Sequence, residues 1–130
     1  MIVDTSAIVA IVRSEPEAAD FIAAIADAEV VRISTATYVE ACVVLNGVRD
    51  AMRIRFLDEF LRENRVLAEP VTEDQARIAR DAYRDYGRGS EHPARLNFGD
   101  CFAYALAAVT GEPLLFKGDD FIHTDIKPAV

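Results

Sequence analysis

Five acidic residues occupy positions from which they could form a metal site. Asp4 directly follows a short apolar run, and the pair Asp119 and Asp120 comes soon after another. Asp100 opens a helical stretch, whereas Glu40 lies inside a helical pattern of apolar and small residues. Carboxylates at strand ends and helix starts can converge, and oxygen-rich clusters hold Mg²⁺ or Mn²⁺. Hard cations of this kind activate water and stabilise a leaving oxygen.

Each acid taken alone has a simpler explanation. Asp4 could cap a helix that begins at Thr5, Asp100 could complement a helix dipole, and the two later aspartates could form a polar turn. Glu40 is harder to explain in this way, because charged residues are seldom fully buried without a partner. A solvated helix face remains an alternative for it. The prediction of a site therefore rests on the joint arrangement of the acids.

Alternating strands and helices must position these acids. Short apolar, β-prone runs predict strands at 2–3, 30–33, 66–71 and 114–117. Helical patterns occupy the segments between them, at 6–12, 34–46, 51–63, 72–86 and 98–110. The alternation predicts a three-layer α/β/α fold with a mainly parallel central sheet. Ligands bind beyond the carboxyl ends of the strands in such sheets, where Asp4 and the Asp119–Asp120 pair would lie.

Several residues predict where helices begin and end. Ser14 reads as the N-cap of a further helix, with Pro16 in its first turn. Thr72 is predicted to cap the helix over 72–86, and Gly47 to follow the end of the helix over 34–46. The Gly- and Pro-containing segment 87–95 predicts a surface loop.

Length and composition predict a single domain over residues 1–130. The hydrophobic fraction of 52% is ample for a core without disulfides. Cys42 and Cys101 are expected to be buried thiols in a reducing compartment. No apolar stretch approaches the ~20 residues that span a bilayer, and the N-terminus does not resemble a secretion signal. We therefore expect a cytoplasmic protein with no membrane partner.

The net charge of −8 counts against simple nucleic-acid binding, which usually needs a basic surface. Metal ions could neutralise part of a clustered acidic charge, or a basic partner could match an acidic face. Basic side chains near the predicted site could contact a phosphate backbone, but each is more readily explained as an ordinary surface charge. These residues are Arg13, Arg88, Arg95 and Lys117. The isolated His92 and His123 are expected to be structural, and Tyr83 and Tyr86 to pack rather than stack bases.

Four segments resemble the motifs of PIN-domain ribonucleases, in the family's order. Residues 2–7 (IVDTSA) resemble the family's start, and residues 37–40 (TYVE) resemble the helix segment that carries its glutamate. Residues 96–101 (LNFGDC) are similar to the third acidic motif. Residues 114–121 (LLFKGDDF) and 124–126 (TDI) resemble the closing segment of VapC-type toxins of type II toxin–antitoxin systems. The resemblance covers essentially the whole chain.

The resemblance implies a Mg²⁺- or Mn²⁺-dependent endoribonuclease. In the family, the acids that match Asp4, Glu40 and Asp100 form the metal site, and a fourth acid comes from the closing loop. Asp120, directly before a phenylalanine, matches that fourth acid better than Asp119, and both remain candidates.

The resemblance also implies partners. Hydroxyls that match Thr5 or Ser6 often line the site in the family. VapC-type toxins cleave RNA, dimerise and are blocked by a VapB-type antitoxin, commonly through a basic side chain. A homodimer, an RNA substrate and a basic antitoxin segment on an acidic toxin surface are therefore expected.

Alternatives fit less well. A response-regulator receiver needs a phosphoacceptor aspartate after a mid-chain strand, but Asp50 and Asp58 lie beside or inside a helical pattern. A haloacid-type phosphatase needs Asp-x-Asp, whereas Asp4 is followed by Thr5 and Ser6. A housekeeping PIN nuclease in RNA processing and a non-catalytic acidic PIN scaffold that binds a basic partner remain alternatives within the family.

Overall fold

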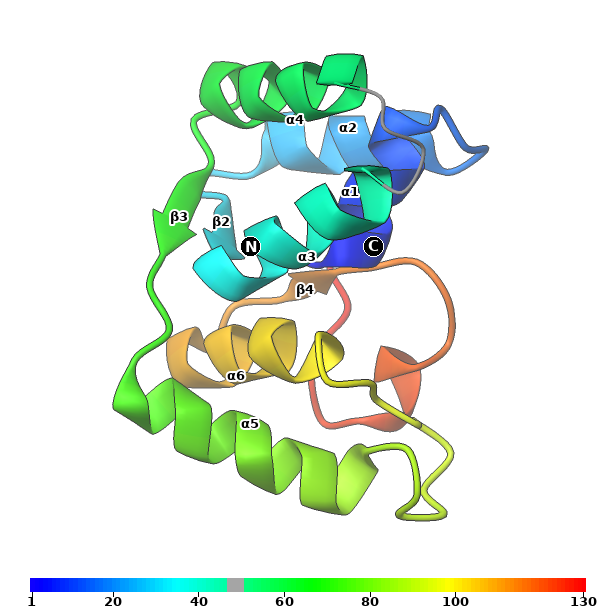
Figure 1. Ribbon diagram of the computed structural model, residues 1–130, viewed down its shortest axis with the longest axis vertical. Coiled ribbons are helices and arrows are strands. Elements are labelled where there is room, and N and C mark those ends of the chain that lie inside the picture. Colours follow the sequence, from blue (N-terminus) through cyan, green and yellow to red (C-terminus); the bar gives the residue numbers. More distant parts are fainter. Residues whose placement is uncertain (47–50) are drawn as a thin grey trace.

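A four-stranded parallel sheet lies at the centre of the computed structural model, which describes residues 1–46 and 51–130. The strand order is β3-β2-β1-β4, and each neighbouring pair is parallel. Helices cover both faces of the sheet (Figure 1), so the predicted three-layer α/β fold is confirmed. The strands are β1 (Ile2–Val3), β2 (Arg32–Ser34), β3 (Leu67–Glu69) and β4 (Leu114–Leu115).

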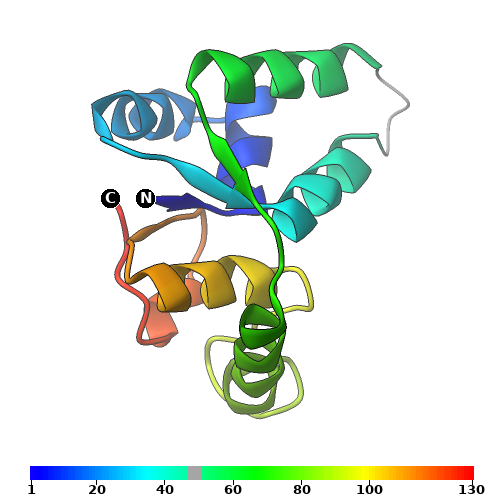
Figure 2. The same cartoon turned by 90° about the vertical axis from the view of Figure 1, so that its left-hand side faces the viewer.

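The helices divide between the two faces of the sheet. The first group is α1 (Thr5–Val12), α2 (Ala18–Asp27), α3 (Thr35–Asn46) and α4 (Ala51–Glu63). The second group is α5 (Glu73–Tyr86), α6 (Asp100–Thr110) and the 3₁₀ turn η1 (Phe121–His123). Figure 2 shows α1, α2 and α4 on one side of the sheet and α5 and α6 on the other.

Alternating strand residues build the two hydrophobic cores. Ile2 and Leu114 are register partners and pack with α5 and α6, whereas Val3 and Leu115, the next pair, pack with α1 to α4. Successive strand side chains point to opposite faces, so a run of two apolar residues serves both cores at once. All four side chains are completely buried. Strands buried on both faces explain why these runs contain no polar residue.

The order in which the parallel strands are added to the sheet reverses beside β1. The chain proceeds outward from β1 to β2 to β3, then returns to place β4 on the other side of β1. The loops that follow β1 and β4 therefore leave neighbouring strands at the same edge, which is where α/β proteins bind ligands. Asp4 follows β1, and its N–H donates to the carbonyl of Leu115 at 2.9 Å.

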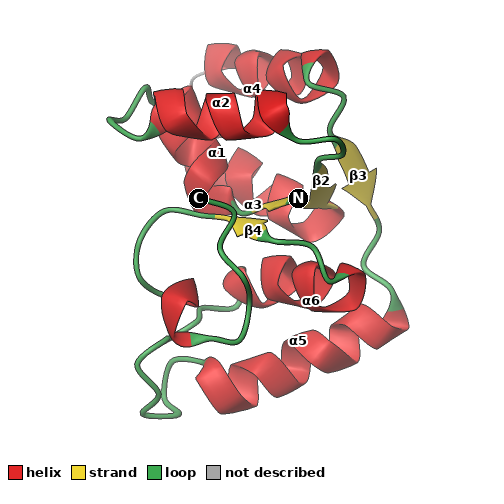
Figure 3. Cartoon of the chain, turned by 180° about the vertical axis from the view of Figure 1, so that it is seen from behind, coloured by secondary structure: helices red, strands yellow, loops and turns green. Residues whose placement is uncertain are grey.

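Different features lie beside the two edge strands, β4 and β3. The C-terminal segment runs back past β4 (Figure 3), where Leu114 N–H donates to Lys127 O and Ala129 N–H donates to Leu114 O, each at 2.9 Å. At the other edge, Pro70 follows β3 directly, as is usual for proline beside an edge strand. No helix in the described ranges is long and apolar enough to cross a membrane.

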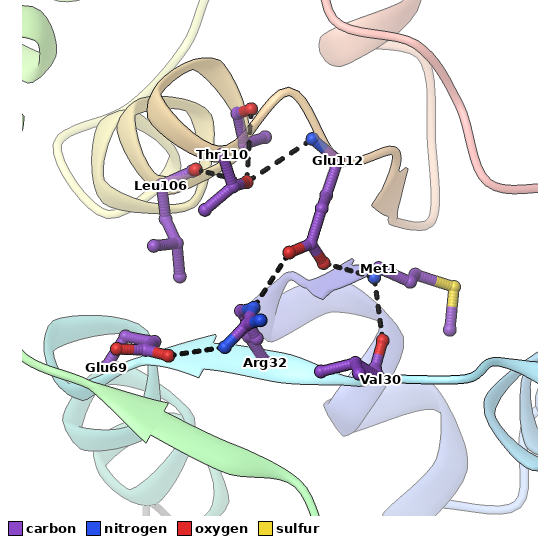
Figure 4. Close-up of polar contacts among 8 residues, drawn as sticks. Met1, Val30, Arg32, Glu69, Leu106, Thr110 and Glu112 are labelled. Atoms are coloured by element: carbon purple, nitrogen blue, oxygen red, sulfur yellow. Dashed lines mark hydrogen bonds and ion pairs between the residues drawn. The ribbon is translucent and has the colours of Figure 1, made fainter.

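An ion-pair network joins the amino-terminal side of the sheet to the segment before β4 (Figure 4). Arg32 Nη1 contacts Glu69 Oε1 and Arg32 Nε contacts Glu112 Oε1, each at 2.7 Å. The Met1 amine also contacts Glu112 and donates to Val30 O. Met1, Arg32 and Glu112 lie at the amino ends of strands, opposite to Asp4, and Glu69 ends the edge strand β3, so the network ties strands together without entering the predicted site.

One predicted helix start is wrong. Ser14 has φ 54° and does not cap a helix; α2 begins at Ala18. Ser14 N–H donates to Ile11 O and Glu15 N–H donates to Ala10 O, which is the hydrogen-bond pattern of a Schellman motif. Ser14 therefore ends α1 in a left-handed conformation instead of starting α2.

Most other boundaries agree with the sequence. The Thr72 hydroxyl accepts from Gln75 N–H at the start of α5, as predicted. The second strand begins two residues later than expected, and α6 begins at Asp100 instead of 98. Cys101 is buried, but Cys42 is only partly so, which corrects the expectation for that thiol. Gly47, the predicted residue after α3, lies outside the described residues.

Leu115→Ala should lower the free energy of unfolding by about 2–5 kcal/mol, because it leaves a cavity in a fully packed core. Leu67→Ala, at a side chain that is 48% exposed on the edge strand, is the matched control and should cost much less. Urea unfolding monitored by circular dichroism measures both. Equal losses in the two variants would contradict this account of the core.

Candidate metal centre

Asp4 caps a helix with one carboxylate oxygen, and its other oxygen accepts no hydrogen bond from the described residues. Its Oδ2 accepts from Ser6 N–H at 2.9 Å and from the Ser6 hydroxyl at 2.6 Å, so it caps α1 as the simpler explanation required. Its Oδ1 is buried and has no hydrogen-bond partner among residues 1–46 and 51–130. A buried polar atom without a partner is costly and calls for an explanation, such as a ligand. The cap therefore accounts for only half of this carboxylate.

Glu40 points from α3 toward the start of α1 and of α6. The Thr5 hydroxyl donates to Glu40 Oε2 at 2.5 Å and also lies 3.4 Å from Thr37 O. The carboxylate lies directly against the backbone of Gly99, because a Cβ at that residue would overlap it. Glu40 is thus half-buried at the site, and the solvated-face alternative does not describe it.

Asp100 begins α6 and is held by Asn97. Asp100 N–H donates to Asn97 Oδ1 at 2.9 Å, and Asn97 N–H donates to Asp100 Oδ2 at 2.7 Å. This reciprocal pair has the geometry of a capping box. Its signal in the sequence is an Asn three residues before an Asp, which sequence reasoning missed.

The acids interact electrostatically. Burial, together with the negative charges of Asp4, Asp120 and Glu40, raises the pKa of Asp100 to about 7, although the hydrogen bond from Asn97 N–H lowers it. Burial also raises the pKa of Asp4, and the charge of Glu40 adds to that shift. Asp100 is only 8% exposed and Asp4 only 1%. Four carboxylates, from the ends of β1 and β4 and from α3 and α6, therefore lie within electrostatic reach of one another.

The loop between β4 and η1 is tied to Asp4 through Ser6. Lys117 N–H donates to Ser6 Oγ at 2.9 Å, while the same hydroxyl donates to Asp4 Oδ2. Asp119 and Asp120 follow in this loop and are exposed. Of the two, Asp120 supplies a charge that acts on Asp100.

Lys117 forms ion pairs with two carboxylates of this protein. Its Nζ contacts Glu15 Oε2 at 2.8 Å and Glu17 Oε2 at 2.9 Å. These ion pairs connect the β4–η1 loop to the turn after α1. Arg13, Arg88 and Arg95 are exposed and make no ion pair with another described residue.

Some of the histidine and tyrosine side chains pack in the structure, and others are exposed. His92 Nδ1 accepts from Ala94 N–H, and its ring packs edge-on against Tyr86 at 4.9 Å, so this histidine is structural as predicted. Tyr86 also packs against Tyr104, whereas Tyr83 is 45% exposed. His123 is exposed on η1.

The donor set fits a hard cation. All four interacting groups are carboxylates, the ligands that Mg²⁺ and Mn²⁺ prefer. Among the described side chains, no three His, Cys, Asp or Glu are drawn together closely enough to hold a metal ion as they stand. The unpartnered Asp4 Oδ1 and the raised pKa of Asp100 are the observations that indicate a cation site here.

Comparison with known proteins shows the family to which this chain belongs. The family model of the PIN domain matches residues 1–127. Ribonuclease VapC28 of Mycobacterium tuberculosis is 56% identical over 130 residues, which cover 100% of this chain and 98% of that protein. The chain belongs to the PIN-domain family, among the VapC ribonucleases. Ribonuclease VapC42 of the same organism is also 56% identical, over 99% of this PIN domain and 98% of its own length.

The fold has a solved counterpart. The crystal structure of Mycobacterium tuberculosis VapC20, described as a sarcin–ricin loop cleaving toxin, superimposes with a TM-score of 0.76. It covers 96% of this PIN domain and 95% of that chain, at 20% sequence identity. This likeness supports the fold alone. The family membership excludes the receiver and the haloacid-type phosphatase.

In metal-free protein, the stability difference between Asp100→Asn and wild type should depend on pH. A raised pKa in the folded state stabilises the fold at low pH, and this contribution is lost as pH rises from about 4 through about 7. Asparagine keeps the acceptor for Asn97 N–H and carries no charge. The variant should therefore gain about 2 kcal/mol relative to wild type between pH 5 and pH 8.

Urea unfolding in EDTA at the two pH values measures this difference. Glu112→Gln is the control for a general charge effect, because the Glu112 carboxylate pairs with Arg32 and lies outside the site. A difference between Asp100→Asn and wild type that stays constant with pH would contradict the proposed burial of an ionised carboxylate.

Proposed function

We propose that this PIN domain is a VapC-type toxin: an endoribonuclease that uses Mg²⁺ or Mn²⁺ and is neutralised by a VapB-type antitoxin in the cytoplasm. The observation that carries the proposal is the buried Asp4 Oδ1, which has no partner among the described residues, beside an Asp100 on which the charges of Asp4, Glu40 and Asp120 act. We propose one such domain over residues 1–130.

Four carboxylates are the proposed ligands: Asp4, Glu40, Asp100 and Asp120. Asp120 is preferred to Asp119 because its charge acts on Asp100, and Asp119 is the alternative fourth acid. When bound, a hard cation at these oxygens makes water more acidic and stabilises the leaving oxygen of a phosphodiester.

The chain's own side chains supply the rest of the chemistry. Asp4 Oδ2 is fixed by Ser6, so its unpartnered Oδ1 is oriented toward a ligand without further loss of side-chain freedom. The Thr5 hydroxyl orients Glu40 in the same way. Asp100 is fixed by Asn97, and a carboxylate oxygen of the cluster that does not bind the cation can accept a proton from an attacking water.

The acidic surface is compatible with this function. At a net charge of −8, binding of an RNA backbone depends on cations at the site and on exposed arginines such as Arg13, Arg88 and Arg95. The same acidic charge suits a basic antitoxin segment that competes with RNA.

Two alternatives are weaker. A housekeeping PIN nuclease would use the same site, but the toxin reading is favoured because relatives such as VapC28 are VapC ribonucleases over their full length. A non-catalytic acidic scaffold would not require four interacting carboxylates, three of which each accept a hydrogen bond from a hydroxyl or a backbone N–H.

Cleavage of a panel of structured RNAs tests the function. Wild type should cleave with Mg²⁺ or Mn²⁺ and not with EDTA, and Asp4→Asn should lower the rate at least ~100-fold, because it weakens a ligand to the cation. Glu112→Gln, at a carboxylate on the opposite end of the sheet, should cleave normally. Equal residual cleavage by wild type and Asp4→Asn would reveal contamination and count against the proposal.

A homodimer is also proposed, through the outer face of α3. Val39 and Val43 are 57% and 67% exposed, and neighbouring Phe98 is 76% exposed. A groove of about 450 Å³ joins them and is lined by Ala36, Val39, Glu40, Val43, Phe98, Gly99 and Phe102. An apolar exposed patch next to the site is typical of a protein interface, and a second copy would bury it.

Val43→Glu should convert the dimer to a monomer, because it places a charge in an apolar contact. Light scattering coupled to size-exclusion chromatography gives the mass. Ile22→Glu, at a 41% exposed apolar residue on α2, is the control and should remain dimeric. A wild-type monomer at every concentration would contradict the proposed dimer.

A further inference from the structure

Gly99 is a glycine that its own backbone does not require. Its φ of −65° and ψ of −43° are ordinary right-handed helical values that any residue adopts. The reason for glycine lies in the space around it: an added Cβ would overlap the Oε1, Cδ and Oε2 atoms of Glu40. The position of a side chain at residue 99 is thus taken by the carboxylate of another helix.

Two features fix the position of the Glu40 carboxylate: a hydrogen bond and the space beside a glycine. The Thr5 hydroxyl donates to its Oε2, while the bare backbone of Gly99 leaves room for the other side of the carboxylate. Asp100 follows Gly99 directly, and the charge of Glu40 acts on Asp100. The contact therefore sets how closely two carboxylates from α3 and α6 approach, and these helices pack together in the fold (Figure 1).

We propose that Gly99 is a positioning residue: the absence of a side chain at this position lets the Glu40 carboxylate lie beside Asp100 as a ligand pair for a divalent cation. This inference rests on the proposed metal-dependent function. It assigns Gly99 no contact with the cation or with RNA; the residue acts through Glu40.

The geometry predicts an unusual outcome for Gly99→Ala. The atoms that a methyl group would displace belong to the end of a flexible side chain, so the fold can accommodate the change. Alanine is also more favourable than glycine at helical backbone angles, because it restricts the unfolded chain. The cost should fall on Glu40, whose carboxylate must leave Thr5 and move away from Asp100.

Thermal unfolding across a series of Mn²⁺ concentrations tests the proposal. Wild type should melt at higher temperature as Mn²⁺ is added, since the cation binds the folded state. In Gly99→Ala, the concentration that gives half of this shift should rise about tenfold or more, as for other residues that orient a metal ligand. RNA cleavage by Gly99→Ala should recover at high Mn²⁺, whereas cleavage by Glu40→Ala should not.

A double-mutant cycle separates positioning from a general structural effect. Urea unfolding in EDTA compares the effect of Gly99→Ala in wild type with its effect in Glu40→Ala, where the overlapping carboxylate is gone. Gly99→Ala should be distinctly more stabilising in the Glu40→Ala background. An identical effect in both backgrounds would mean that residue 99 acts independently of Glu40, which would overturn the inference.

The outcomes distinguish the inference from the function beneath it. Absence of a Mn²⁺-induced shift in wild type would reject the metal-dependent function itself. A normal shift in wild type together with the same half-maximal concentration in Gly99→Ala would reject only the role of Gly99. If Gly99→Ala alone does not fold, recovery of folding in Gly99→Ala with Glu40→Ala supports the inference, and continued unfolding overturns it.

Discussion

The fold must withstand the electrostatic repulsion among carboxylates that lie near one another in a partly buried site. Asp4 and Asp100 are buried and Glu40 is half-buried; burial raises the pKa of both aspartates, and the negative charge of Glu40 adds to each of these shifts. Such a cluster costs stability in the absence of a cation, so the surrounding fold must hold it together. Hydroxyl and amide donors from Ser6, Thr5 and Asn97 each fix one carboxylate and leave other oxygens available.

The sheet provides that rigid support. Its shortest strands, β1 and β4, are only two residues long, yet each serves both hydrophobic cores because Ile2 and Leu114 face one side and Val3 and Leu115 the other. The loop after each of these strands then begins from a fully packed residue. Asp4 and the Lys117 loop inherit that rigidity, and Ser6 connects them.

Charge distribution explains how an acidic protein can act on an acidic polymer. The basic residue closest to the closing aspartates, Lys117, is paired with Glu15 and Glu17 and serves the architecture of the loop. Attraction for RNA must then arise at the cation site and at exposed arginines, which makes catalysis and substrate binding depend on the same ions. A basic antitoxin segment would compete for that same acidic surface.

The sequence by itself determined the order of strands and helices, the parallel α/β class and the acids of the candidate site, because apolar periodicity and motif spacing are local signals. It misassigned Ser14, whose left-handed conformation follows from the hydrogen bonds that end α1. Only the tertiary structure showed that Lys117 pairs with Glu15 and Glu17 and that Glu40 occupies the space beside Gly99. Those contacts join residues from different elements, and their distances depend on how helices pack across the sheet, which no local pattern encodes.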